Sequence, residues 1–159
     1  MKYTIRLIEE KDNQAVEQVI RSCLIEFHAN HKGTAWEDSD LGKFYSIYQK
    51  QGHCYYVVED EVGNIVGGAG IGLLDEEKGI CELQKMYCLP VIRGTTVTHQ
   101  LMEKVLSFAK KHYQVCYLET LKQMVAANKF YQKYGFVSLM QPLVLTSHNA
   151  CDVWYRKDL

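Results

Sequence analysis

Apolar residues recur along the chain with two different periods, and each period predicts a different kind of element. Tyr3, Ile5 and Leu7 alternate with polar residues over 2–8, as in a strand with one buried face. Residues 15–27 place apolar side chains three and four positions apart, as an amphipathic helix does, and Asp12 stands where it can cap that helix. The same reasoning predicts helices from Asp38 or Asp40 to 48, over 96–113 and over 124–134, and strands over 54–59, 65–74, 80–88, 115–119, 136–139 and 152–156.

The resulting order, β-α-α-β-β-β-α-β-α-β-β, predicts an α/β fold with a mixed sheet. Residues 61–64 form the turn of a hairpin, whereas the later strand–helix–strand segment requires a crossover that makes neighbouring strands parallel. Residues 67–72, GGAGIG, lie inside a strand with no helix after them, so we interpret these glycines as close packing or a bulge and not as a dinucleotide-binding loop. The chain contains no repeat or linker, so we expect one domain over 1–159.

Composition excludes several classes of protein. The 159 residues are 47% hydrophobic and 23% charged, which is typical of a folded chain and not of a disordered one. No apolar run is long enough to span a membrane, and charges interrupt the first apolar stretch, which argues against a secretory signal. The net charge of −1 gives no electrostatic reason to expect a nucleic acid or a membrane surface as partner.

Cysteine and histidine spacing gives no metal site. The six cysteines include no CxxC pair, and His28 and His31 have no local carboxylate to complete a ligand set. We therefore expect reduced, buried thiols, a cytoplasmic location and no metal.

The most informative stretch is residues 82–110. A predicted strand runs into a tight loop at Arg93 and Gly94, and that loop opens directly into a long helix. Backbone N–H groups and the positive end of the helix would then face an anion such as a pyrophosphate. Every strand–loop–helix junction shares this property, so the arrangement alone leaves a plain connection open.

Two residue strings at this junction and downstream resemble the GNAT superfamily of N-acetyltransferases. The family's acetyl-CoA loop reads R/Q-x-x-G-x-G/A, and the corresponding residues here are Arg93, Gly94, Thr95, Thr96, Val97 and Thr98. A second signature is matched by Ala127, Phe130-Tyr131 and Gly135-Phe136. The strings ELQKMYCLP and CDVWYRKDL further resemble a branch of bacterial uncharacterised acetyltransferases. The resemblance implies a GNAT-like fold with acetyl-CoA as co-substrate.

The resemblance also implies roles for individual residues. It assigns the pyrophosphate to the N–H groups of residues 93–98, and the pantetheine and acetyl carbonyl to Met86, Tyr87 and Cys88. Glu82 is then the candidate general base, and Tyr131 the candidate general acid, because a tyrosine with its usual pKa of about 10 is protonated at neutral pH. The alternatives are that Glu82 is a solvated strand residue paired with Lys85 or another neighbour, and that Tyr131 only fills a helix–sheet interface.

The function implied is transfer of an acetyl group to a primary amine of a small molecule or peptide, directly within a ternary complex. The acceptor pocket is expected between the first two helices, the loop 28–37 and the C-terminal strands. Edge strands near the C-terminus offer a surface for a homodimer, as in many relatives. The residues Glu26, Trp36, Glu37, Asp38 and Tyr45 in these segments would suit a small cationic amine.

Thr96 and Thr98 depart from the family, because both stand where it has glycine in the loop. A threonine there either crowds the pyrophosphate or caps the helix and offers a hydroxyl to the phosphate. The departure therefore supports an alternative function, a non-catalytic acyl-CoA-binding or regulatory module. A structural partner protein that binds neither ligand is a third interpretation.

Overall fold

The computed structural model describes residues 1–159 and confirms the predicted order of helices and strands. The strands are β1 (Tyr3–Leu7), β2 (Cys54–Asp60), β3 (Ile65–Asp75), β4 (Ile80–Cys88), β5 (Val115–Thr120), β6 (Val137–Leu139) and β7 (Val153–Asp158). The helices are α1 (Asn13–Glu26), α2 (Phe44–Ile47), α3 (Thr96–His112) and α4 (Val125–Lys133), with short 3-10 turns at Glu10–Asp12, Ala35–Glu37 and Pro90–Ile92.

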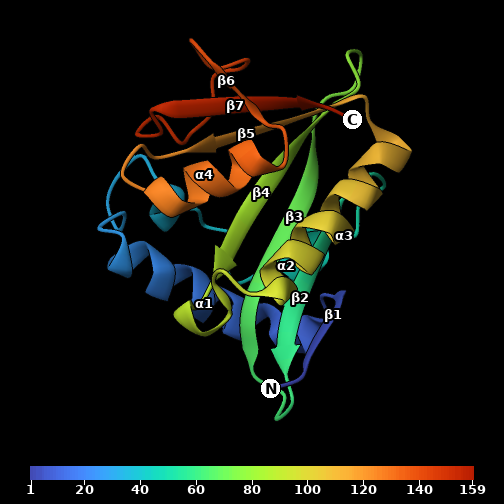
Figure 1. Cartoon of the computed structure of the whole chain (residues 1–159), viewed down its shortest axis with the longest axis vertical. Coiled ribbons are helices and arrows are strands. Elements are labelled where there is room, and N and C mark those ends of the chain that lie inside the picture. Colours follow the sequence, from blue (N-terminus) through green and yellow to red (C-terminus); the bar gives the residue numbers. More distant parts are fainter.

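The seven strands form one mixed sheet in the order β1-β2-β3-β4-β5-β7-β6. Every neighbouring pair is antiparallel except β4 and β5, which are parallel because α3 crosses over between them. This parallel pair is short: only Ile80, Cys81 and Glu82 have partners on β5. Beyond Glu82 the two strands diverge, as Figure 1 shows, and one edge of β4 has no strand beside it.

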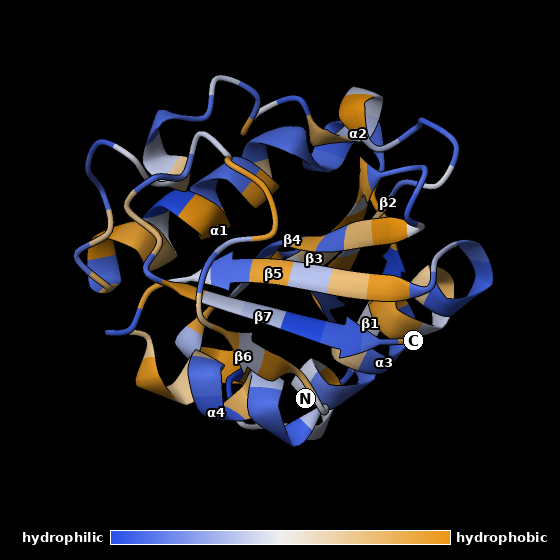
Figure 2. Ribbon diagram, turned by 90° about the horizontal axis from the view of Figure 1, so that it is seen from above, coloured by the Kyte–Doolittle hydropathy of each residue, from blue (hydrophilic) through white to orange (hydrophobic).

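Helices cover both faces of the sheet. Seen from above, α1 and α2 lie on one side of the strands, and α3 and α4 lie on the other (Figure 2). A core of 19 buried residues joins the sheet to α3 and α4, and a second core of 15 joins it to α1 and α2. Two separate apolar cores are what a sheet buried on both faces requires.

The second predicted helix is wrong in its length. We expected it to begin at Asp38 or Asp40, but only Phe44–Ile47 is helical and the residues before it form turns. Tertiary contacts account for the difference: Asp38 is bound by side chains of two distant segments, and the N–H of Tyr45 donates to Asn13 Oδ1 at 2.9 Å. Because these contacts hold the residues before Phe44 in turns, the apolar spacing of the segment does not extend the helix.

Glycines of β3 allow close packing, as predicted from the GGAGIG string. Tyr55 of β2 lies across them, and a Cβ at Gly68 or Gly70 would stand 2.6 or 2.7 Å from its ring. Any larger residue at these two positions would collide with Tyr55, so the small side chains serve the packing of β2 on β3. All six cysteines are present as thiols.

Candidate active site

A bulge in β4 shapes the site where the strand leaves β5. Gly70 pairs with Gln84 and Gly68 pairs with Tyr87, so Lys85 and Met86 face a single residue of β3. Lys85 has a φ of 52°, a left-handed conformation that favours glycine, and the Tyr55 hydroxyl donates to its carbonyl at 2.9 Å. This bulge turns the free edge of β4 toward the space between β4 and β5.

A largely apolar cavity of about 240 Å³ runs along that free edge. It is walled by Cys23 and Phe27 of the α1 end, and by α4 on the other side. Of the predicted co-substrate residues, Met86, Tyr87, Cys88, Arg93, Gly94 and Thr98 line it, whereas Thr95, Thr96 and Val97 do not. The structure therefore brings most of the predicted set to one cavity.

The loop before α3 offers fewer free N–H groups than the six predicted. Within it, the N–H groups of Arg93, Thr95 and Thr98 already donate to carbonyls of the loop, at 3.2–3.3 Å. The N–H groups of the remaining residues, Gly94, Thr96 and Val97, donate to no backbone carbonyl. Thr96 and Val97 begin α3, and the first turn of a helix has no acceptor for its N–H groups. An anion at this loop would therefore meet three free donors beside the positive end of a 17-residue helix.

The side chain of Arg93 does not point toward an anion at that loop. Its guanidinium donates to both oxygens of Glu26 at 2.6 and 2.8 Å and to the carbonyl of Cys88 at 2.7 Å. It also lies over the ring of Phe27, 4.9 Å from the centroid. Arg93 thus ties the end of α1 to the end of β4, and Glu26 is used in this pair and does not reach the acceptor side.

The two threonines in the loop have different environments. The hydroxyl of Thr98 is buried and donates to the carbonyl of Ile92, so this side chain secures the first turn of α3. Thr96 is exposed. Both environments are set by the protein chain itself, without a bound phosphate.

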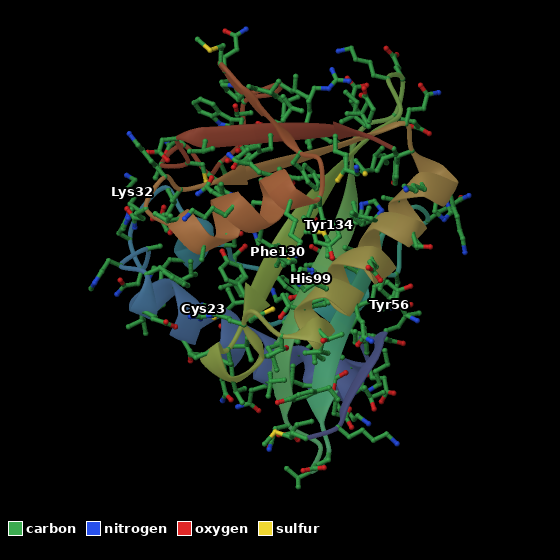
Figure 3. All side chains as sticks on the ribbon, in the orientation of Figure 1. Cys23, Lys32, Tyr56, His99, Phe130 and Tyr134 are labelled. Atoms are coloured by element: carbon green, nitrogen blue, oxygen red, sulfur yellow. The ribbon has the colours of Figure 1, made fainter.

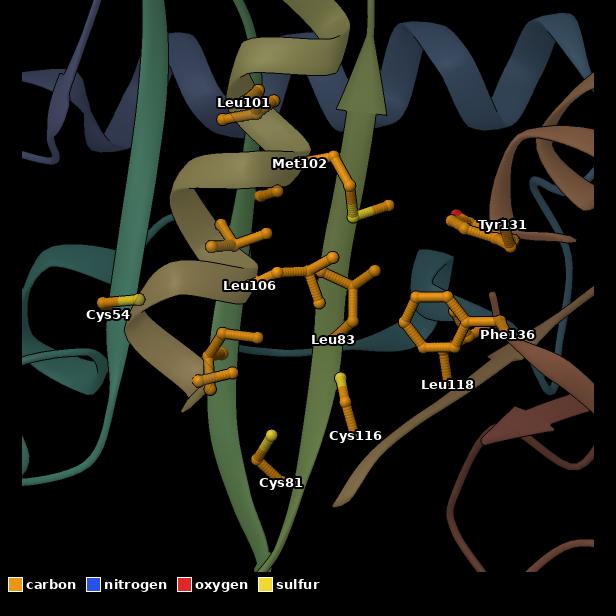
Figure 4. Close-up of a cluster of buried hydrophobic side chains, with 14 of the residues drawn as sticks. Cys54, Cys81, Leu83, Leu101, Met102, Leu106, Cys116, Leu118, Tyr131 and Phe136 are labelled. Carbon is orange, nitrogen blue, oxygen red and sulfur yellow. The ribbon is translucent and has the colours of Figure 1, made fainter. Parts of the chain in front are cut away.

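Tyr131 projects from α4 into the gap between the strands. The residue is 9% exposed, and its ring lies against that of Phe136 (Figure 4), with 6.1 Å between the centroids. The ring of Tyr155 lies 6.2 Å away on the same measure. Burial raises the pKa of the Tyr131 phenol, so the hydroxyl is protonated at neutral pH. That hydroxyl has no partner in the chain, yet no fully buried polar atom lacks one, so it opens onto the cavities beside it.

Asn128 secures the N-terminal turn of α4, a role that the sequence did not suggest. Its amide donates to the carbonyls of Leu121 and Met124 at 3.0 and 2.8 Å, and its Oδ1 accepts from the hydroxyl of Tyr155 at 2.9 Å. It thereby fixes the helix that carries Tyr131.

Aromatic residues join α4 to α3. Nδ1 of His99 and the hydroxyl of Tyr134 form a hydrogen bond of 2.8 Å, and both rings lie against Phe130 (Figure 3). These contacts hold the two helices that wall the apolar cavity at a fixed spacing.

Glu82 lies at the last paired position of β4, next to the divergence of the strands. Its Oε1 accepts from the Gln84 amide at 2.7 Å, so its partner is Gln84 and not Lys85. The hydroxyl of Tyr48 in turn donates to Gln84 Oε1 at 2.8 Å. Burial raises the pKa of Glu82, because its charged form loses hydration.

Glu82 also borders a more polar cavity of about 460 Å³, which Tyr131 does not line. Of the residues expected to receive the acceptor, Glu37 and Asp38 line this cavity, whereas Glu26, Trp36 and Tyr45 do not. His148, which sequence reasoning missed, belongs to its wall and bonds to Asp38 at 2.9 Å. The two residues are 110 positions apart, and no local signal connects them.

A small cavity of about 90 Å³ links the two larger ones. It shares Met86, Tyr87, Met124 and Tyr131 with the apolar cavity, and Thr34, Glu82, Gln84, Lys85, Glu119 and His148 with the polar one. The three cavities therefore adjoin along β4, and this row of cavities, called the path below, has an apolar and a polar end. Tyr131 and Glu82 both line its middle.

No three His, Cys, Asp or Glu side chains come together as a metal site would require. None of the helices combines the length and the apolar character that crossing a membrane demands.

Comparisons with known proteins agree on one family. A family model described as the acetyltransferase (GNAT) family matches residues 14–136. An uncharacterized N-acetyltransferase of Escherichia coli, YjgM, is 37% identical over 98% of this chain and 94% of its own length. The N-acetylaspartate synthetase of Xenopus tropicalis is 34% identical, but over 62% of this chain and only 36% of the relative.

Solved structures show the same fold. An acetyltransferase of the GNAT family from Staphylococcus aureus superposes with a TM-score of 0.87 over 99% of both chains, at 21% identity. The PaiA N-acetyltransferase of Thermoplasma acidophilum, solved with coenzyme A, gives 0.75 over the full length of both chains at 17% identity. With a family match that covers most of its length and a near full-length relative above 30% identity, the chain belongs to the acetyltransferase (GNAT) family.

Proposed function

We propose that the protein transfers an acetyl group from acetyl-CoA to a primary amine of a small molecule or peptide, directly within a ternary complex. The observation that carries the proposal is the row of adjoining cavities along β4, with an apolar end, a polar end, and Tyr131 and Glu82 between them. Two substrates that enter from opposite ends would meet at these two side chains.

The apolar end fits the co-substrate. The free edge of β4 over Met86–Cys88 can accept an extended chain of amides as an additional strand would, which suits the pantetheine. The free N–H groups of Gly94, Thr96 and Val97 suit its pyrophosphate. Acetyl-CoA would supply an activated acetyl thioester. Family membership and two neighbours solved with coenzyme A or acetyl-CoA support this choice of ligand.

Glu82 is the proposed general base. An acceptor amine is protonated at neutral pH and must lose a proton before it can attack a carbonyl carbon. The raised pKa of Glu82 makes its carboxylate a better proton acceptor than an exposed glutamate, and only one of its oxygens is occupied by Gln84. The proton would reach Glu82 directly or through one water.

Tyr131 is the proposed general acid. Its hydroxyl is protonated, has no partner in the chain, and lines the small cavity that connects the two substrate sides. A donor in this state can hydrogen-bond a leaving sulfur and pass a proton to it without first breaking an internal hydrogen bond.

Direct transfer is preferred to an acyl-enzyme route. The thiols that border the path are Cys23, Cys88 and Cys151. Burial raises the pKa of all three, and it brings those of Cys88 and Cys151 to about 12. Since the thiolate and not the thiol is the nucleophile, none of the three is activated at neutral pH. The amine itself is then the attacking group.

A titration of acetyl-CoA by calorimetry, followed by an assay of CoA release with a panel of amines, tests the proposal. Micromolar binding and amine-dependent release of CoA are the expected results. Binding without turnover of any amine would favour the non-catalytic acyl-CoA-binding alternative, and no binding at millimolar acetyl-CoA would overturn both.

A further inference from the structure

The polar cavity beside Glu82 carries far more negative than positive charge. Five carboxylates line it, from Glu37, Asp38, Asp40, Glu82 and Glu119. Lys85 is the only ammonium among its lining residues, and His148 adds a positive charge only when it is protonated. With a neutral imidazole, the wall has an excess of four negative charges.

The single ammonium is already used. Lys85 forms an ion pair with Asp38, and Nε2 of His148 lies 2.9 Å from the same carboxylate. The side chains of Lys85 and Asp38 are 13% and 15% exposed, so the pair is largely shielded from bulk water. Because Lys85 is committed to Asp38, it does not offer a free site for an anionic ligand.

The other four carboxylates are in no ion pair. Glu37 accepts the N–H of Gly33 at 2.9 Å, Glu82 accepts an amide, and Glu119 accepts a hydroxyl of Tyr117 at 3.2 Å and that of Thr146. These donors are neutral and leave the negative charges uncompensated. Asp40 has no side-chain partner in the chain. Like charges that share one cavity repel one another, and a bound cation would relieve that repulsion.

Tyr131 indicates a ligand independently of the acidity of the polar cavity. The residue is 9% exposed, its hydroxyl has no partner in the chain, and it lines the small cavity that shares Glu82, Gln84 and Lys85 with the polar one. An acceptor that reaches this point from the polar side passes Glu82 and the other carboxylates that line the polar cavity.

We propose that the acceptor is a diamine or polyamine, with one amino group at Glu82 for acetylation and a second, protonated amino group against Asp40 and Glu37. The inference rests on the proposed acetyl transfer and specifies its substrate class. An α-amino dicarboxylate would bring its own negative charges to the same unpaired carboxylates, and it is excluded as a good substrate.

The test compares three acceptors that differ in charge: 1,4-diaminobutane, n-butylamine of the same chain length, and aspartate. CoA release from acetyl-CoA is followed at low ionic strength and at 0.5 M NaCl. We expect kcat/KM for diaminobutane to exceed that for butylamine at least tenfold at low ionic strength, with a smaller ratio at high salt because exposed charges are screened. Aspartate should be the slowest.

Two variants localise the effect. Asp40→Asn removes one unpaired carboxylate, and it should lower the diaminobutane-to-butylamine ratio at least threefold. Glu61→Gln is the matched control, because Glu61 is an exposed turn residue outside the cavity, and it should leave the ratio unchanged. Thermal melting of both variants confirms that they fold.

The outcomes separate the inference from the proposed function. Equal rates with diaminobutane and butylamine, or a faster rate with aspartate, would overturn the diamine assignment while the proposed acetyl transfer stood. If no amine turns over, that result counts against the proposed transfer. Titration of both amines into CoA-saturated protein then decides the inference, which is overturned if diaminobutane binds no tighter than butylamine.

Discussion

Removal of the Tyr131 hydroxyl separates a catalytic role from a packing role. In Tyr131→Phe the ring stays between Phe136 and Tyr155, and the hydroxyl that is lost has no partner in the chain. The free energy of unfolding should therefore change by less than about 0.5 kcal/mol, as for substitutions that remove no interaction. Turnover should fall on the order of 10²- to 10⁴-fold, the range for loss of a positioned general acid.

Tyr155→Phe is the matched control. Tyr155 is also buried, at 2% exposure, but its hydroxyl donates to Asn128 Oδ1 at 2.9 Å and accepts from Gln132 at 3.3 Å. Its loss leaves the acceptor of Asn128 unsatisfied, which costs about 1–3 kcal/mol. Each kcal/mol should lower Tm by about 2–4 °C in a protein of this size. Turnover per folded molecule should stay close to that of the wild type.

The assay pairs urea unfolding with the initial rate of CoA release for the best amine found. Loss of activity in Tyr131→Phe without loss of stability, and the reverse in Tyr155→Phe, is the expected result. A Tyr131→Phe protein that retains at least half of its kcat would show that the hydroxyl does not donate to the reacting groups, and the role of Tyr131 would reduce to packing.

Four further outcomes follow from the same geometry. Glu82→Gln should lower kcat on the order of 10²-fold in the CoA-release assay. The same variant should be more stable than the wild type at pH 7 but not at pH 4, because the raised pKa of Glu82 favours its neutral form. The wild type therefore loses stability as the pH rises from the pKa of Glu82 in the unfolded chain, about 4.3, through its higher pKa in the folded chain. Urea titrations at pH 4 and pH 7 check the sign. Thr98→Ala should lower the free energy of unfolding by about 1 kcal/mol in thermal melting, because the buried hydroxyl donates to the carbonyl of Ile92. Thr96→Ala, at an exposed position, should change stability and acetyl-CoA affinity little. Equal losses of stability would contradict the different environments of the two threonines. Acetyl-CoA at 100 times its Kd should add about 2.7 kcal/mol to the free energy of unfolding, and an unchanged Tm would show that no native-state site exists.

The element order and the junction before α3 could be predicted from the sequence alone. Both depend on local signals: alternation in strands, three- and four-residue spacing in helices, and a turn at Gly94, whose φ of 70° suits glycine. The resemblance of two short strings to the family then placed Tyr131 and Met86–Cys88 in one region, and the structure does bring them to one cavity. Their chemical roles remain predictions.

Contacts between residues far apart in sequence decided the remaining features of the fold and the site. The length of α2, the direction of the Arg93 side chain toward Glu26, and the bond between Asp38 and His148 all depend on contacts between segments 32–110 residues apart. Periodicity indicates which face of an element is buried, but it carries no information on which distant side chain meets that face. The point at which β4 leaves β5, and with it the whole path past Glu82, is set by sheet register and so exists only in the folded chain.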